Sequence, residues 1–474
     1  MYALIYFDTE DFISPPDSPV HTLPGQLADI MHKYGLVGCF HIIGEKARFM
    51  ERHGLRDAIK SLRRHDISLH FDRGSIHPTT AEEISELDWF RGVERMLFRE
   101  VPGFQALERI FGKCSGLTQH GGTFAAQIIY GTGKLGKPFL YSPFRLPGRN
   151  VVWFCNNLLI GGYQADFYFD NVYRDTTKFE EVLAKMRPYL DERIKTHDFT
   201  ALFGCHPVKT IMNNFPCSNF RNGRSPRPQD WIAPVPIEGV SIPLILKNFE
   251  RLVGELVKHP QVTWTTVDGI HGLYGNRPVL VSDRHVLEGA EAVINNGGPT
   301  FTPVLSAGEL LFLLARRVLS RSNVYEMPQI MGPTEEGSGA TAPAVDFKIE
   351  QIAREIMDSG VSSGYLPPVL SEQNGRISPE RALMLLACHA LARSLPSDNN
   401  LNLSVEAIPG VVEAIENVKN YKGWRVHGER YHQEEILKHF RLQCWTLKPA
   451  FTEVEYKREV VLGRHVNPMF EGRE

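Results

Sequence analysis

The stretch that decides the fold is YALIYFDTED, residues 2–11. Its first six residues form an apolar run typical of a buried strand, and Asp8, Glu10 and Asp11 follow that run directly. A buried strand that ends at clustered carboxylates is a usual way for an α/β protein to present acids to a metal or a reacting group. A solvated acidic turn would give the same pattern, so both interpretations are open on these residues alone.

Two later segments favour the first interpretation. They read HDISLHFDRGSIHP over residues 65–78 and LFGCHP over residues 202–207. Each places histidine at or just after the end of a short apolar run, giving His70, His77 and His206. Acids and imidazoles at successive strand ends indicate a shared site.

Residues 1–275 alternate strand-like and helix-like segments, which predicts βα units around a parallel sheet or barrel. Apolar residues at three- and four-residue intervals mark the helices. The expected strands are Ala3 to Phe7, Val37 to Ile42, Asp66 to His70, Phe139 to Ser142, Asn150 to Phe154, Ala201 to Cys205 and Val262 to Thr266; the expected helices include Leu23 to Tyr34, Phe179 to Lys195 and Leu244 to Lys258.

The pattern changes after Gly275–Pro278, and residues 276–474 are expected to form a second, mainly helical domain. Ser306 and Glu309 have the spacing of a capping box before an apolar helix. Ser378 followed by Pro379 indicates another helix start. Because similar Leu-Pro and Met-Pro pieces follow the helices, a degenerate internal repeat is predicted.

Composition excludes several classes of protein. With 474 residues, the chain should form two or three domains. Its 52 basic and 55 acidic residues favour neither nucleic acid nor an anionic membrane as partner, and no apolar run reaches the length of a membrane span. Seven cysteines without a CxxC pair suit a reducing compartment and argue against a cysteine-based zinc site. Since the start lacks the features of a signal peptide, a cytoplasmic location is expected.

The chemistry of the clustered residues points to a divalent metal. At a strand end, the side chains of Asp8 and of either Glu10 or Asp11 can point into the same site. One acid can then bind a cation while the other accepts a proton. His70 and His77 with one carboxylate would make the open three-ligand site of a catalytic metal, where bound water reaches a pKa of about 7. His206 could then protonate a leaving amine.

The three segments resemble motifs one, two and five of the polysaccharide deacetylase superfamily, also called the NodB homology or carbohydrate esterase family four. The resemblance covers roughly residues 1–275 and implies a distorted (β/α) barrel with its site at the carboxyl ends of the strands. Transferred by position, it makes Asp8 the catalytic base and His206 the general acid. It makes Asp11, His70 and His77 the ligands of a divalent metal, Zn²⁺ above all, and places Leu202 in the pocket for the acetyl methyl group.

The sequence departs from the family pattern in both metal motifs. Thr9 follows Asp8, so Glu10 competes with Asp11 for the metal. His70 and His77 are seven residues apart where the family has four, and Asp72 stands where some members have histidine. A ligand pair of His70 and Asp72 is therefore open, as is a site that holds metal poorly.

Three further features of the sequence can each be interpreted in two ways. The family's third motif brings an arginine to the substrate, and its candidates are His120, in residues 119–122, and Arg145, in residues 145–148; either segment can be an ordinary turn. The segment 213–236 is either a plain excursion or a loop that covers the site. The C-terminal repeats distantly resemble pseudomurein-binding repeats, which would imply glycan binding, whereas a plain helical domain would pack on the barrel or form a homo-oligomer.

The function that these features predict is metal-dependent hydrolysis of an amide, with removal of an N-acetyl group from an amino sugar of a glycan or its precursor. The partner would then be a carbohydrate or small amide substrate. Two alternatives remain: a metal-independent hydrolase of the same superfamily acting on a non-sugar C–N bond, and a catalytically silent protein that binds glycan.

Overall fold

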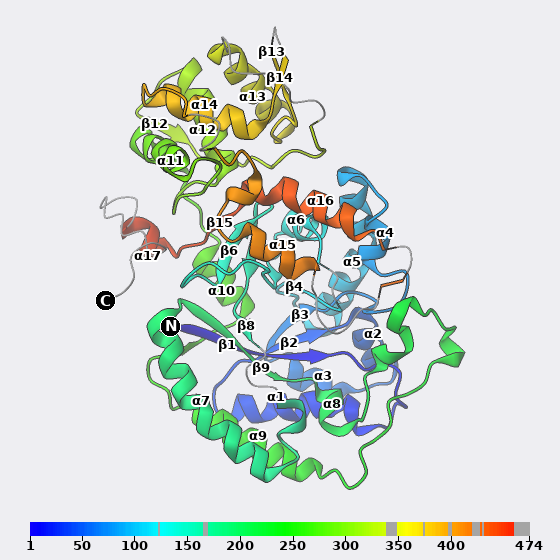
Figure 1. The fold of residues 1–474 in the computed structure, drawn as a ribbon. Coiled ribbons are helices and arrows are strands. Elements are labelled where there is room, and N and C mark those ends of the chain that lie inside the picture. The colour runs from blue at the N-terminus through cyan, green and yellow to red at the C-terminus, as the bar shows by residue number, and fades with distance from the viewer. Residues whose placement is uncertain are drawn as a thin grey trace.

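The computed structural model describes residues 1–458 except 122–123, 165–168, 338–347, 373–374, 397–400, 420–426 and 429–430. At its centre lies a curled, mostly parallel sheet (Figure 1). The deciding stretch forms β1 (Tyr2–Thr9), which pairs in parallel with β2 (Cys39–Ile42), β9 (Phe199–Cys205) and β10 (Thr263–Trp264). Because helices and neighbouring strands cover β1, its apolar residues are buried, as expected for a parallel sheet.

The sheet extends from β1 in both directions. Beyond β2 lie, in order, β3 (Asp66–Leu69), β4 (Leu117–Thr118), β5 (Phe139–Leu140), β7 (Asn157–Ile160), β6 (Val151–Phe154) and β15 (Lys448–Pro449), while β8 (Tyr163–Gln164) lies beyond β9. Among these pairs, only β6 with β7 and β15 with β6 are antiparallel. The predicted fold class, an α/β distorted barrel followed by a helical part, is confirmed.

Amphipathic helices cover the outside of the sheet. In α9 (Ile242–Leu256), for example, Ile245, Phe249, Leu252 and Leu256 are buried at three- and four-residue intervals. The other barrel helices are α1 (Leu23–Lys33), α2 (Gly44–Arg52), α3 (Arg56–Leu62), α4 (Thr80–Ile84), α5 (Trp89–Phe111), α6 (Ala126–Lys134), α7 (Thr176–Thr196), α8 (Pro207–Ile211) and α10 (Val267–Tyr274). The longest, α5, was not predicted; it continues through Pro102 and ends at Gly112, whose φ of 84° is left-handed.

A mainly helical unit follows the barrel. It contains β11 (Leu280–Ser282), α11 (Asp283–Asn296), α12 (Ala307–Leu319), β12 (Val324–Glu326), α13 (Ile349–Ser363), β13 (Leu370–Glu372), β14 (Gly375–Ile377) and α14 (Pro379–Ala390). Ser306 and Glu309 make the predicted capping box, and Ser378 caps α14 with Pro379 in its first turn. Both predicted helix starts are confirmed.

The last described elements return to the barrel. They are α15 (Val411–Lys419), α16 (Gln433–Gln443), β15 and α17 (Glu453–Tyr456), and α15 and α16 lie between the helical unit and the barrel strands (Figure 1). The Phe440 ring of α16 packs on Phe144 and Phe154, with ring centroids 5.5 and 5.2 Å apart. The barrel and the helical part therefore share one continuous hydrophobic core. Among the described residues, no helix combines the length and apolar character needed to cross a bilayer.

Candidate functional site

The candidate site lies where β1, β2, β3, β4 and β9 reach their carboxyl ends. Asp8 belongs to β1 and is in register with His41 of β2. Glu10, His70, His120 and His206 each follow the end of a strand by one or two residues. Because parallel strands end at the same edge of a sheet, side chains distant in sequence meet there.

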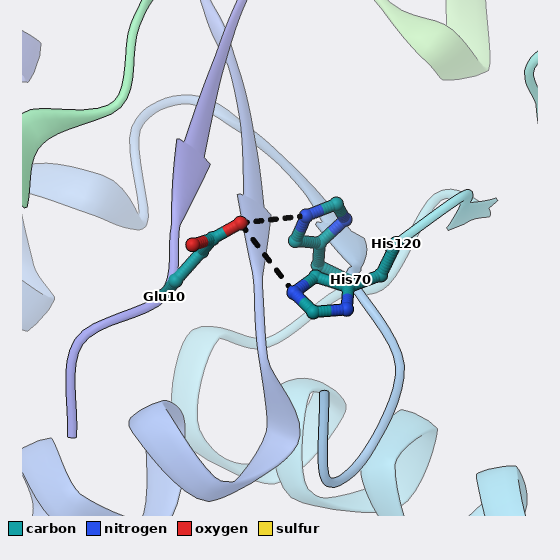
Figure 2. A group of neighbouring side chains, drawn as sticks. All are labelled: Glu10, His70 and His120. Atoms are coloured by element: carbon teal, nitrogen blue, oxygen red, sulfur yellow. Dashed lines mark hydrogen bonds and ion pairs between the residues drawn. The ribbon is translucent and has the colours of Figure 1, made fainter. Parts of the chain in front are cut away.

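One part of the site is a buried group made of Glu10, His70 and His120 (Figure 2). Glu10 Oε1 lies 3.3 Å from His70 Nε2 and 3.5 Å from His120 Nε2. One ligand atom from each residue falls within 4.8 Å of the other two. A carboxylate and two imidazoles are a usual donor set for catalytic zinc, so this group fits a metal ion chemically.

The electrostatics of this group favour metal binding. Burial opposes ionisation of Glu10, but hydrogen bonds from His120 and His70 outweigh it and hold the pKa of the carboxyl well below its usual range. Burial lowers the pKa of His70, although the charge of Asp8 opposes the change. An ionised carboxylate and a neutral imidazole are the protonation states that metal ligation requires.

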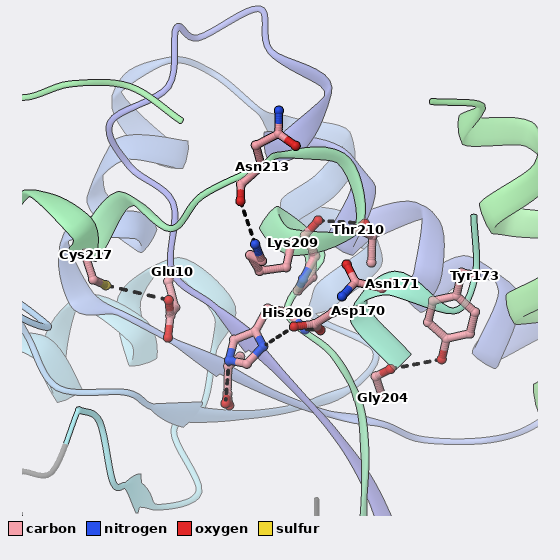
Figure 3. Close-up of polar contacts among 12 residues, drawn as sticks. Glu10, Asp170, Asn171, Tyr173, Gly204, His206, Lys209, Thr210, Asn213 and Cys217 are labelled. Carbon is pink, nitrogen blue, oxygen red and sulfur yellow. Dashed lines mark hydrogen bonds and ion pairs between the residues drawn. The ribbon is translucent and has the colours of Figure 1, made fainter. Parts of the chain in front are cut away.

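Beside this group, the Asp8 carboxylate contacts two imidazoles, those of His41 and His206. Asp8 Oδ1 lies 2.8 Å from His41 Nδ1, and Asp8 Oδ2 lies 3.6 Å from His206 Nε2. On its other side, His206 Nδ1 lies 3.0 Å from the carboxylate of fully buried Asp170, which also accepts the backbone N–H of His206 at 2.7 Å (Figure 3). Asp170 therefore fixes both the ring and the backbone of His206.

The pKa shifts of His206 and Asp8 suit a general acid and a general base, respectively. Burial opposes protonation of His206, but the Asp170 carboxylate outweighs it and raises the pKa of the imidazole to about 9. Burial would raise the pKa of Asp8, but the electrostatic interaction with the His70 ring and the hydrogen bond to His41 lower it below its ordinary value. At neutral pH, His206 is thus protonated and Asp8 ionised.

The local backbone positions His206 through a bulge. The pairing of β1 with β9 slips by one residue next to Gly204, whose carbonyl accepts the Tyr173 hydroxyl at 2.9 Å. A Cβ atom at Gly204 would come within 2.3 Å of the Phe7 ring. Only glycine fits this close approach.

Three residues proposed from the sequence as metal ligands lie outside the buried group. Asp11 turns away from it and accepts the backbone N–H of Ser14 at 3.0 Å and the Ser14 hydroxyl at 2.6 Å. His77 contacts Glu82 and the Phe220 carbonyl at 2.7 and 2.9 Å. Asp72, the alternate, pairs with Arg48 at 2.8 Å. Of the sequence-based set, the structure brings His70 and the alternate Glu10 together.

The residues proposed to bind substrate are scattered. His120 joins Glu10 and His70 in the buried group. Leu202 lies within β9, in register with Ile5, and forms part of the core. The side chain of Arg145 is 74 % exposed and faces Glu413 of α15 at 3.5 Å. Arg145 is therefore not in contact with the buried group.

Sequence reasoning missed three residues of the site. His41 is the third residue of the buried strand CFHI, and the rule that singled out His70 could have found it. Asp170 lies in a short 3₁₀ helix, Phe169–Asn171, and Cys217 lies in a kinked 3₁₀ segment, Pro216–Gly223. Neither of these two stands at a strand end, so periodicity gave no signal for them.

The segment 213–236 lies against the site. The ring of Phe215 packs edge-on against His206, with centroids 4.8 Å apart. Two residues later, Cys217 Sγ lies 3.7 Å from Glu10 Oε2. Of the two alternatives for this segment, the structure favours a loop that borders the site.

Comparisons with known proteins find solved structures only. No family model and no curated protein matches the chain. A protein from Mycobacterium smegmatis described as a candidate polysaccharide deacetylase matches with 14% identity and a TM-score of 0.35, over 56% of this chain and 86% of that one. A family 4 acetyl xylan esterase from Clostridium thermocellum, in complex with cobalt, matches with 11% identity and a TM-score of 0.29, over 57% and 90% of the two chains. A pseudoenzyme of the same family matches with 9% identity and a TM-score of 0.29, over 56% and 65%. These are proteins of the superfamily that the three motifs resemble.

Proposed function

We propose that this protein is a metal-dependent amide hydrolase that removes an N-acetyl group from an amino sugar of a glycan or glycan precursor. One observation carries the proposal: an ionised acid, Asp8, and a protonated imidazole, His206, lie 3.6 Å apart beside a buried Glu10, His70 and His120 group. A base, an acid and a metal-binding group side by side are the parts that amide hydrolysis requires.

Each residue has a role that follows from its contacts. Glu10, His70 and His120 would hold the metal. When bound there, Zn²⁺ lowers the pKa of a water molecule and polarises the amide carbonyl. Asp8 accepts a proton from the attacking water, while His41 Nδ1, 2.8 Å away, fixes its orientation.

The second half of the reaction belongs to His206. Its Nε2 donates a proton to the departing nitrogen, because an amine is a poor leaving group unless it is protonated. Asp170 holds Nδ1 at 3.0 Å and stabilises the imidazolium beforehand. The paired carboxylate thereby keeps the acid protonated at neutral pH.

The substrate class rests on the resemblance of the three motifs, and the assay must therefore compare substrates. Acetate release from N-acetylglucosamine oligomers is measured beside release from O-acetylated xylan and from simple acetamides. Purified protein is assayed as isolated, after chelation, and after chelation followed by Zn²⁺. We expect release from the amino-sugar oligomer that is lost on chelation and returns with zinc.

Other outcomes identify the alternatives. Turnover of a simple amide that survives chelation would indicate metal-independent hydrolysis of a non-sugar C–N bond. Binding of the oligomer without acetate release, in protein that holds stoichiometric zinc, would indicate a silent glycan-binding protein.

A further inference from the structure

Cys217 reaches the metal-binding group from a different part of the chain. It lies in the segment Pro216–Gly223 after β9, and its side chain is 5 % exposed. Its thiol donates to Glu10 Oε2 at 3.7 Å (Figure 3). Sγ also lies 3.8 Å from His120 Nε2. The sulfur therefore contacts two of the three residues proposed to hold the metal.

Three of the separations between ligand atoms are close to the edges of a tetrahedral zinc site. Zinc binds nitrogen and oxygen at about 2.0–2.2 Å and sulfur at about 2.3 Å, so tetrahedral ligand atoms lie about 3.3–3.6 Å apart, or about 3.5–3.7 Å where one is sulfur. The edges from Glu10 Oε1 to the two imidazoles measure 3.3 and 3.5 Å. The edge from Cys217 Sγ to His120 Nε2 measures 3.8 Å, within about 0.1 Å of the sulfur range. The sulfur contacts the other oxygen of Glu10, Oε2, and is not among the ligand atoms that lie within 4.8 Å of one another. Ligation therefore requires the Cys217 side chain or the Glu10 carboxylate to rotate when the metal binds.

We propose that Cys217 is a fourth protein ligand of the metal held by Glu10, His70 and His120. The proposal rests on the metal site of the proposed function and adds a thiolate to it. On binding, the Sγ–H bond breaks, the proton goes to solvent, and the sulfur electron pair forms the bond to the cation. The metal is neither oxidised nor reduced, so no further reactant is needed.

A thiolate ligand has two consequences. Sulfur favours Zn²⁺ or Co²⁺ over the hard cations Mg²⁺ and Ca²⁺. In addition, three protein ligands leave a tetrahedral position for water, whereas with four the catalytic water would have to enter as a fifth ligand. Since Cys217 belongs to the loop bordering the site, the loop would set both the choice of metal and the access of water to it.

Cobalt spectroscopy tests the ligand directly. The full chain is stripped of metal, titrated with Co²⁺, and compared with Cys217→Ser and with Cys388→Ser, a buried cysteine of α14 in the helical unit. We expect wild type and Cys388→Ser to show visible d–d bands and a near-ultraviolet sulfur-to-cobalt charge-transfer band. Cys217→Ser should keep the visible bands, lose the charge-transfer band, and bind Co²⁺ at least about tenfold more weakly.

A measurement on the wild type alone guards against a variant that fails to fold. X-ray absorption of the zinc-loaded protein should show one sulfur neighbour at about 2.3 Å. Visible bands without charge transfer, or a zinc shell of nitrogen and oxygen only, would overturn the ligand role of Cys217 while leaving the metal site intact. Failure to bind either ion would overturn the metal site, and with it both proposals.

Discussion

Asp8 is the residue whose role is most sharply separated from that of its neighbours. It contacts His41 and His206, whereas Glu10, two residues further and just past the end of β1, faces His70 and His120. We expect Asp8→Asn to lower kcat on the order of 10² to 10⁴ while metal content stays near that of wild type. His70→Ala should lose both activity and metal.

Metal analysis and kcat measured on the same preparations check this division of roles. Equal loss of metal in both variants would make Asp8 a ligand and leave the base unassigned. Circular dichroism of each variant serves as the control for folding.

His206 should control the alkaline side of the pH profile. The acid must be protonated, and its pKa is raised to about 9, so kcat/KM should fall as the pH rises through about 9. Since the Asp170 carboxylate is the largest of the charges that raise this pKa against burial, with Glu10 and Asp8 adding to it, Asp170→Asn should move the alkaline limb to lower pH.

Profiles of kcat/KM for wild type and Asp170→Asn test the link. His206→Ala should cost about 10² to 10⁴ on an amide and less on an ester, whose leaving group needs less help from an acid. An alkaline limb that stays in place in Asp170→Asn would show that His206 does not produce it.

At the level of elements, His77 joins three segments of the chain. Its imidazole contacts Glu82, at the start of α4, and the Phe220 carbonyl in the loop after β9. Glu82 in turn accepts the backbone N–H of Gly428 at 2.5 Å. This network ties the loop that borders the site to the barrel and to the C-terminal part.

The charges of this pair set its pH dependence. Burial opposes both charged forms, but Glu82 raises the pKa of His77, and the His77 hydrogen bond lowers the pKa of Glu82 to about 2. The stabilisation from His77 is therefore complete below its ordinary pKa of about 6.5 and is lost as the pH rises through the raised value. The stabilisation from Glu82 is present above its ordinary pKa of about 4.3 and is lost as the pH falls toward about 2.

His77→Ala should consequently behave as a structural variant. We expect the free energy of unfolding near pH 6 to fall by about 1–3 kcal/mol, because a buried hydrogen-bonded pair is broken. Metal content should remain close to that of wild type. Urea unfolding and metal analysis are the measurements, and stoichiometric loss of metal from folded His77→Ala would restore His77 as a ligand.

The sequence predicted which residues lie at the ends of the strands, but it did not predict where the side chains of the loop residues point. The apolar run of β1 and the shorter runs of β3 and β9 placed Asp8, His70 and His206 at one edge of the sheet. No such rule decides where a side chain points after the strand has ended. The resemblance of the second motif assigned the second imidazole to His77. The structure instead puts His120 beside Glu10, while a contact with the Phe220 carbonyl, 143 residues away, holds His77 elsewhere.

At the scale of the whole molecule, the C-terminal part is joined to the barrel by hydrogen bonds and charge as well as by apolar contact. β15 continues the sheet beside β6, although nothing in its two residues predicts a strand. The domain boundary at residue 275 stays a prediction, since the shared core and the added strand run across it.

The ion pair between Lys448 of β15 and Glu309 of α12 can test whether the barrel and the helical unit unfold together. Lys448 Nζ donates to both carboxylate oxygens at 2.9 and 2.8 Å, and the side chains are 1% and 2% exposed. Without the lysine, the buried Glu309 carboxylate keeps the more distant Arg277, whose Nη1 lies 4.0 Å away. Lys448→Met should therefore lower the free energy of unfolding by about 3–5 kcal/mol, because a buried charge loses its main partner. Glu309→Gln keeps a side chain able to cap α12 at Ser306 but removes the charge.

Adding Glu309→Gln to Lys448→Met should therefore recover part of the lost stability, because the neutral amide removes a buried carboxylate that has lost its main partner. Urea unfolding of the two single variants, the double variant and wild type gives the coupling energy. If the barrel and the helical unit were independent, Lys448→Met would separate the unfolding of β15 from that of α12 into two transitions. We expect one transition that shifts as a whole, since the core on both sides of the pair is continuous.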